Sequence, residues 1–179
     1  MPSHSEKIIY NVHPNPIMRL MSAKAMILRE AFEFAFSALE RTLEGTDEKE
    51  YTHRLTEASN DIQSILNHLS RMTNLNIPRI IKGDLDYTPD HWPIDYVEHN
   101  YGLDRLMGDI IEGKENVLEG VAGLSERQLE EVIPLMTGPY PRKIGLFAYI
   151  GELFHHRGQI AFIRGTIKRL KERNPDFLK

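Results

Sequence analysis

The chain has 179 residues, no cysteine, and 22 basic against 26 acidic residues, which gives a formal net charge of −4 with neutral histidines. This length is typical of one domain, so we expect a single domain over residues 1–179. The missing cysteine excludes disulfide scaffolds, cysteine nucleophiles, thiolate zinc sites and iron–sulfur clusters, so demanding chemistry has to use His, Asp, Glu, Tyr or Ser.

The charge and hydropathy patterns bear on partners and location. An acidic chain without a cluster of basic residues predicts no nucleic-acid partner. No apolar run is long enough to span a bilayer, and the N-terminus lacks the basic and apolar segments of a secretory signal. The sequence therefore predicts no membrane partner and a cytoplasmic location.

The first predicted helix covers about residues 16–44. Asn15 followed by Pro16 is typical of a helix start, because asparagine caps free N–H groups and proline suits the first helical position. Apolar residues then recur every three or four positions, as on a helix with one buried face. Gly45 is the predicted stop.

A second helical region lies between residues 47 and 72, where apolar residues recur at steps of four and three. It is either one helix that begins near Asp47, or a short helix followed by a longer one capped at Ser59. The segment 82–93 contains glycine and prolines, and it is predicted to be a connecting loop.

Two more long helices are predicted over about 94–121 and 143–172. Between them, residues 125–128 form a capping-box motif that predicts a short helix, and the segment 136–142 is predicted to be a second loop. No alternation with a period of two indicates a strand. We therefore expect an all-α protein, a four-helix bundle whose core lies within about 16–172.

Polar residues at inward positions of such a bundle are candidates for chemistry. On the last predicted helix, Glu152 and His156 lie one turn apart on one face, so only one of His155 and His156 is expected to face inward. In the second helical region, His68 lies at the edge of the apolar stripe. It is either a hydrogen-bonded histidine at the edge of the core or a metal ligand.

Two E-x-x-H motifs, Glu50 to His53 and Glu152 to His155, indicate a lesser alternative. Carboxylate-bridged di-iron bundles use this motif on two of their four helices. Glu50 lies near a predicted helix start, however, whereas Glu152 lies about three turns inside its helix. The di-iron protein therefore remains the lesser alternative.

Three segments resemble the DinB/YfiT-like superfamily, and together they extend the resemblance over about residues 16–172. They are His155-His156-Arg157-Gly158-Gln159, Leu66-Asn67-His68-Leu69 and residues 124–129. The resemblance implies a four-helix bundle that holds one divalent metal ion, usually nickel or zinc, with one histidine from the second helix and two, four residues apart, from the last. Carried over by position, the ligands are His68, Glu152 and His156.

The chain departs from the family pattern in two places. Glu152 stands where the family usually has histidine, and the only tryptophan, Trp92, does not precede the second helix. Glu152 either completes a set of two imidazoles and one carboxylate, which is a known metal set, or it forms an ion pair with a protonated His156 in a decayed site. Asp90 and His91 are candidates to cap the site.

The resemblance implies a metal-dependent enzyme, either a transferase that uses a low-molecular-weight thiol such as bacillithiol, mycothiol or glutathione, or a hydrolase. A divalent ion with three protein ligands and open positions acidifies bound water to a pKa of about 7 and also holds a thiol as thiolate. The small-molecule substrate then supplies the thiol that this cysteine-free chain lacks. The alternative is a non-enzymatic bundle that binds metal weakly or acts through association.

Further expectations concern individual residues. The two longest predicted helices carry more large apolar residues than one buried face uses, which predicts a homodimer; these are Phe32, Phe34, Phe36, Phe147, Tyr149 and Phe154. Gly158 is expected to permit a close helix contact, His155 to support a ligand, and His53 to lie on the surface.

Overall fold

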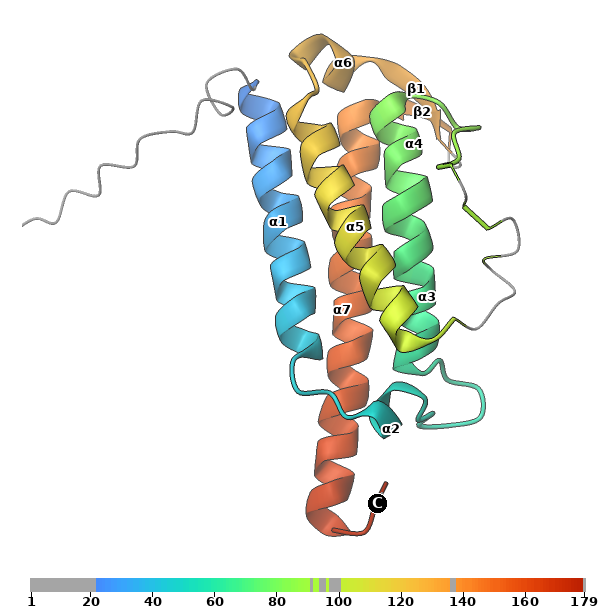
Figure 1. Cartoon of the computed structure of the whole chain (residues 1–179). Coiled ribbons are helices and arrows are strands. Elements are labelled where there is room, and N and C mark those ends of the chain that lie inside the picture. Colours follow the sequence, from blue (N-terminus) through green and yellow to red (C-terminus); the bar gives the residue numbers. More distant parts are fainter. Residues whose placement is uncertain (1–21, 91, 94–95, 97–100, 136–137, 179) are drawn as a thin grey trace, which may run out of the picture.

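The computed structural model describes residues 22–90, 92–93, 96, 101–135 and 138–178, which are mostly helical (Figure 1). Four long helical segments lie side by side: α1 (Ala23–Leu43), the run of α3 (Ile62–Arg71), η2 (Met72–Asn76) and α4 (Ile77–Lys82), then α5 (Leu103–Ala122) and α7 (Arg142–Arg173). The short elements are α2 (Glu48–Tyr51), α6 (Glu126–Glu130), β1 (Val132–Leu135) and β2 (Gly138–Pro141).

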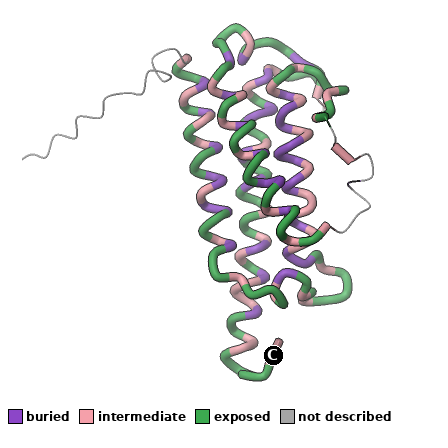
Figure 2. Tube along the Cα trace, in the orientation of Figure 1, coloured by how far each residue is buried: buried purple, intermediate pink, exposed green. Residues whose placement is uncertain are grey.

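The long segments enclose one apolar core. Both α5 and α7 pack against α1 and against the run from α3 to α4, so the four segments surround a common centre. Buried residues recur along all four segments, whereas the end of α7 beyond Ile167 has none (Figure 2). Large side chains with almost no exposure fill this centre, among them Phe32, Phe36, Leu66, Leu106 and Leu146. None of the described helices is long and apolar enough to cross a membrane.

The first helix starts later than the sequence predicts. Ser22 is extended, with φ −68° and ψ 149°, and its side chain accepts a hydrogen bond from the Ala25 N–H, so α1 begins at Ala23. Serine satisfies an N–H group that the first helical turn leaves free. The expected start at Asn15-Pro16 lies outside the described residues. The prediction of one unbroken helix from residue 16 is wrong, because Ser22 is not helical. The predicted stop is confirmed, because α1 ends at Leu43 and Gly45 has a φ of 67°.

The second region follows the two-helix alternative. Asp47 caps the short α2, and Asp61 caps α3 by accepting a hydrogen bond from the Ser64 N–H, so the predicted cap at Ser59 is wrong. Ser59 instead closes a turn with Thr56. A carboxylate is as good an N-cap as a hydroxyl, and the sequence offered both close together. The helical run then continues to Lys82, beyond the predicted end.

A π-helical turn, η2, interrupts this run where it faces α5. The Thr73 hydroxyl donates to the carbonyls of Leu69 and Ser70, and the Asn74 amide donates to the Ser70 carbonyl. These side-chain donors compete with backbone N–H groups for the same carbonyls, which disturbs the regular α-helical hydrogen bonds at this turn. Opposite them, a Cβ on Gly113 would lie 2.5 Å from Thr73 Oγ1, so only glycine permits this contact between η2 and α5.

The C-terminal half contains both confirmed and corrected predictions. The capping box of Ser125 and Gln128 forms and α6 follows it, as predicted. The helix expected from 94 begins only at Leu103, after an extended Gly102. The loop expected over 136–142 contains strand β2, which pairs antiparallel with β1. The prolines in this segment argued against a strand, so the sequence did not predict the hairpin. Each strand of a two-stranded ribbon has a free edge, however, where a residue without an N–H group is tolerated.

Candidate metal centre

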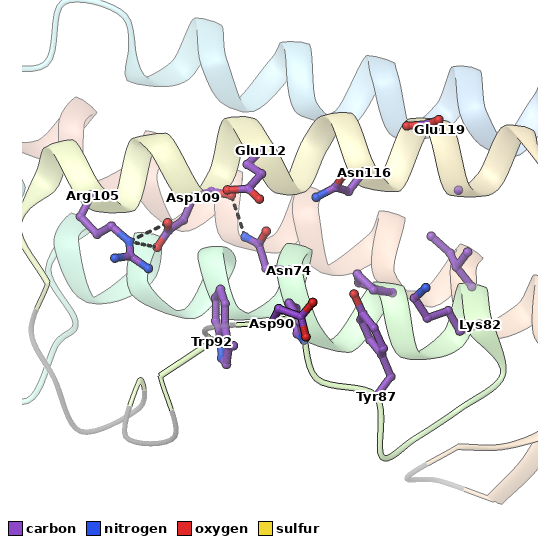
Figure 3. A pocket seen from close by; sticks show the side chains of 14 residues that line it. Asn74, Lys82, Tyr87, Asp90, Trp92, Arg105, Asp109, Glu112, Asn116 and Glu119 are labelled. Atoms are coloured by element: carbon purple, nitrogen blue, oxygen red, sulfur yellow. Dashed lines mark hydrogen bonds and ion pairs between the residues drawn. The ribbon is translucent and has the colours of Figure 1, made fainter.

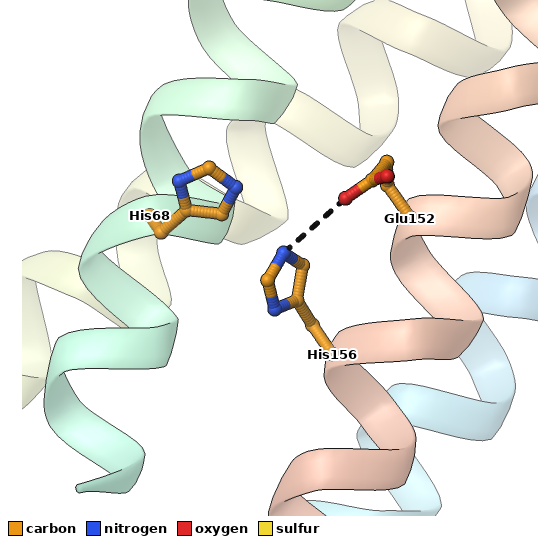
Figure 4. Close-up of side chains that lie close together, drawn as sticks. All are labelled: His68, Glu152 and His156. Atoms are coloured by element: carbon orange, nitrogen blue, oxygen red, sulfur yellow. Dashed lines mark ion pairs between the residues drawn. The ribbon is translucent and has the colours of Figure 1, made fainter. Parts of the chain in front are cut away.

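Three predicted site residues meet between α3 and α7. His68 extends from α3, and Glu152 and His156 extend from successive turns of α7, with their polar ends turned toward one another (Figure 4). One possible ligand atom from each lies within 4.8 Å of the other two, and this is the one such group of three among the described residues. The imidazole centroids of His68 and His156 are 4.6 Å apart.

Helical periodicity places these side chains beside the core. In α3, the neighbouring Ile65, Leu66 and Leu69 are buried, which leaves His68 half-buried at the edge of the apolar face. In α7, Leu153 and Ile160 are buried, and His156, between them in the sequence, faces α3 with 14% of its side chain exposed. The Glu152 side chain is 52% exposed, so one side of the group is open to solvent.

His156 presents an unused nitrogen to the group. Its Nδ1 lies 2.9 Å from Gln159 Oε1. A carboxamide oxygen accepts but does not donate, so the neutral tautomer that satisfies this contact carries its proton on Nδ1 and its lone pair on Nε2. Nε2 is buried and has no hydrogen-bond partner, and it lies 3.6 Å from Glu152 Oε2. Hydrogen bonding of the distal nitrogen is how proteins orient a metal-binding histidine.

His68 has a different partner. Its Nδ1 lies 3.3 Å from an Arg71 guanidinium nitrogen, which only donates, so the neutral tautomer that satisfies this contact carries its proton on Nε2. A metal ion held at Nε2 would require the other tautomer, with the proton on Nδ1, in place of the contact with Arg71. Burial lowers the pKa of His68 below its usual range, and the nearby His156 and Arg71 lower it further, which favours the neutral form that a ligand needs.

We expect the metal-free protein to lose stability in mild acid because of His68. Its pKa is lower in the folded than in the unfolded chain, where it is about 6.5. As the pH falls below about 6.5, His68 therefore takes up a proton more readily in the unfolded than in the folded chain. The free energy of unfolding decreases until the pH has fallen through the lowered pKa of the folded state. Urea unfolding at pH 7.5 and 5, with chelator present, measures this loss. The His68→Gln variant is expected to lose less, and an equal loss would assign the effect to other groups.

Other candidates lie elsewhere. His155 is exposed, with its ring centroid 5.1 Å from that of His156, and no hydrogen bond links it to the group. Asp90 lines a separate cavity, so the expectation that it caps the site is wrong, and His91 is outside the described residues. An added Cβ on Gly158 would meet nothing within 4 Å, so the expected close helix contact is absent there.

The residues of the di-iron alternative do not converge. Glu50 pairs with Lys171 at 2.7 Å and lies 3.7 Å from Arg164. His53 is half-buried rather than on the surface, because its ring packs edge-on against Phe177. Neither side chain belongs to the group formed by His68, Glu152 and His156. The structure therefore gives no support to a site built from both E-x-x-H motifs.

A buried polar network was not predicted from the sequence. The Asp109 carboxylate accepts hydrogen bonds from the Tyr96 hydroxyl at 2.7 Å and from Arg105 Nε at 2.7 and 2.8 Å. The Tyr96 hydroxyl also contacts Ser70 Oγ at 2.5 Å, and burial raises the pKa of Tyr96. One signal was available, because Asp109 interrupts the apolar stripe of α5 four residues after an arginine, the spacing of a helical ion pair.

Comparison with known proteins gives a likeness of fold alone. No family model matches the sequence, and no curated protein matches it. A solved structure, described as the conserved protein of locus from Enterococcus faecalis, is similar with a TM-score of 0.58 and 18% sequence identity. The match covers 78% of this chain and 94% of that chain. The chain thus has a mostly helical architecture like that of the Enterococcus faecalis protein.

Proposed function

We propose that the chain is a four-helix bundle of the DinB/YfiT type in which His68, Glu152 and His156 hold one divalent metal ion, zinc or nickel. One observation carries this proposal: the buried His156 Nε2 has no hydrogen-bond partner, and His156 belongs to the group of three side chains whose possible ligand atoms converge. Two imidazoles and a carboxylate are a set that binds zinc in hydrolases. The present separations are close enough for modest side-chain movements to bring all three groups to one ion.

The bound ion would act as a Lewis acid with open positions, where it acidifies water or a substrate thiol. The protein residues would hold the ion and admit the substrate from the side where Glu152 is exposed. We therefore propose a metal-dependent enzyme, a low-molecular-weight thiol transferase or a hydrolase. Elemental analysis of untagged protein tests the site: about one metal ion per chain is expected, whereas two iron atoms would favour the di-iron alternative and no metal the non-enzymatic bundle.

Substitution of Glu152 distinguishes its two possible roles, metal ligand and ion-pair partner of His156. If it is a ligand, Glu152→Ala is expected to lower metal affinity about 10- to 100-fold or more, at least as much as losing a supporting partner. Glu152→His is expected to keep the metal, because imidazole replaces the carboxylate as ligand. Chelator-competition titration measures both, with Glu172→Ala as the matched control, since Glu172 is also an exposed glutamate of α7. Unchanged affinity in Glu152→Ala would leave only the ion pair with His156.

We also propose a homodimer, through an apolar face on α1 and α7. Of the six residues behind this expectation, Phe32 and Phe36 are buried in the core and Tyr149 is half-buried, so these three do not serve an interface. The exposed members are accompanied by further exposed apolar residues, and together they form the face: Ile27, Phe34, Ile144, Phe147, Phe154 and Phe162.

The proposed occupant of this face is a second copy of the chain. Gly151 and Gly158 alternate with the phenylalanines along α7, and a Cβ added to either would meet no atom within 4 Å. Aromatic rings from a second copy can therefore pack against these two glycines. Light scattering at micromolar concentration is expected to give twice the chain mass of 20.7 kDa. A single-chain mass would contradict the dimer, and Phe147→Glu is expected to produce that mass if this face is the interface.

A further inference from the structure

A cavity of about 460 Å³ lies between the run of η2 and α4 and helix α5, beside the segment that carries Tyr87, Asp90 and Trp92 (Figure 3). Its lining contains none of the three candidate metal ligands. The cavity is therefore a separate site, and binding there does not depend on the proposed metal.

The lining of the cavity is acidic. Asp109 and Arg105 pair with each other, but Asp90, Glu112 and Glu119 have no ion-pair partner among the described residues. Among the described residues of the lining, Lys82 is the one further cationic side chain. These described lining residues thus have a net charge of −2, which favours a positively charged ligand.

Asn74 adds a hydrogen-bond acceptor to the lining. The residue is only 6% exposed, and its Nδ2 donates to the carbonyls of Asp109 at 2.6 Å and Ser70 at 2.9 Å. These bonds fix the amide, and the side chain lines the cavity on the side of Glu112 and Asn116 (Figure 3). Its Oδ1 has no hydrogen-bond partner within the described part of the chain. Because Oδ1 lines the cavity and is not fully buried, it is free to accept a hydrogen bond from an N–H group of a ligand.

Aromatic rings complete the lining. The Lys82 ammonium lies 4.5 Å from the Tyr87 ring centroid, so this ring already contacts a cation. The Trp92 ring stacks on Tyr96 with centroids 4.4 Å apart and an interplanar angle of 17°, which holds it in place. Aromatic faces attract ammonium groups and also pack against methylene groups.

The carboxylates of the lining do not converge on one point in the way that three protein ligands of a single ion do. Within the described residues, the group of His68, Glu152 and His156 is the one set of three His, Asp or Glu residues whose ligand atoms converge. Glu112 and Glu119 are seven residues apart on α5, which places them about two turns and about 10 Å apart along the helix. A ligand that meets both needs two positive groups joined by a spacer.

We propose that this cavity binds a linear aliphatic polyamine. One ammonium group lies near Glu112 and donates to Asn74 Oδ1, and another lies near Glu119. The methylene chain between them packs against Pro78, Ile81 and the aromatic rings, all of which line the cavity. Each feature of the ligand thus meets a matching feature of the lining: positive charge, N–H donors, length and apolar spacer.

Trp92 makes the proposal directly testable, because it is the only tryptophan of the chain and it lines the cavity. We expect a saturable change in tryptophan fluorescence when spermidine is added to the full-length protein at low ionic strength, with and without a metal chelator. The shorter diamine putrescine is expected to bind at least several-fold more weakly, because it cannot reach both carboxylates. Binding in the presence of chelator separates this site from the proposed metal centre.

The double variant Glu112→Gln, Glu119→Gln is expected to weaken spermidine binding at least tenfold, and Lys82→Met to strengthen it by removing a like charge. Glu115→Gln is the matched control, since Glu115 is an exposed glutamate of α5 that does not line the cavity. No saturable change at millimolar spermidine would overturn the proposal. So would equal weakening in the control, equal affinity for propylamine, or tighter binding of Mg²⁺, because each indicates general charge attraction or another ligand.

Discussion

Replacing His156 by alanine is expected to lower the affinity for zinc or nickel at least 100-fold, the largest effect on metal binding that we predict. The Nε2 atom of His156 is buried and has no hydrogen-bond partner, and the contact of Nδ1 with Gln159 orients the ring. Its loss leaves one imidazole and one largely exposed carboxylate, and even the loss of a supporting hydrogen bond typically costs 10- to 100-fold. Chelator-competition titration at pH 7.5 measures the change.

His155→Ala is the matched control for this experiment. The two histidines are neighbours on α7, but His155 is exposed and lies outside the group of possible ligands. We expect its substitution to leave metal affinity within a few-fold of the wild-type value. If His155→Ala lowers affinity as much as His156→Ala, the ion is held by a different set of side chains. If neither changes affinity, the proposed metal centre is wrong.

Asp109→Ala is expected to reduce the free energy of unfolding by about 3 kcal/mol, the largest effect on stability that we predict. The substitution leaves the buried Tyr96 hydroxyl without its carboxylate acceptor and removes the partner of Arg105. Breaking a buried ion pair costs about 3–5 kcal/mol, and the half-exposed Arg105 places this case at the lower end because water solvates the freed cation.

Urea unfolding followed by far-ultraviolet circular dichroism measures this loss. Glu115→Ala, a substitution of an exposed acidic residue of the same helix, is expected to change the free energy of unfolding by less than about 0.5 kcal/mol. Asp109→Asn is expected to fall between the two, because the amide oxygen still accepts one hydrogen bond from Tyr96. A loss below about 1 kcal/mol in Asp109→Ala would mean that the network contributes little to stability.

Capping residues and apolar periodicity in the sequence predicted several helix boundaries correctly. The stop after α1, the capping box of α6 and nearly the full extent of α7 follow from residues adjacent in the sequence. Such signals act within one or two helical turns, because caps and apolar periodicity depend on neighbouring backbone groups. The sequence also determined that Glu152 and His156 lie one turn apart on the same face, because this follows from their four-residue spacing within one helix.

The tertiary structure decided what depends on contacts between distant segments. The sequence alone left His68 open between a core-edge histidine and a ligand, and only the packing of α3 on α7 brings it to His156. The prolines of the β-hairpin argued locally against strands, but the pairing of β1 with β2 overrides that preference.

The cavity beside α5 has the same origin. The Asn74 amide is held by carbonyls of two different elements, and the acidic residues of α5 face a loop that precedes them in the chain. Periodicity predicts which face of a helix is buried, but it does not predict which distant segment covers that face. The sequence by itself therefore determined the helices and the ligand types they carry, whereas packing between distant elements decided which side chains meet.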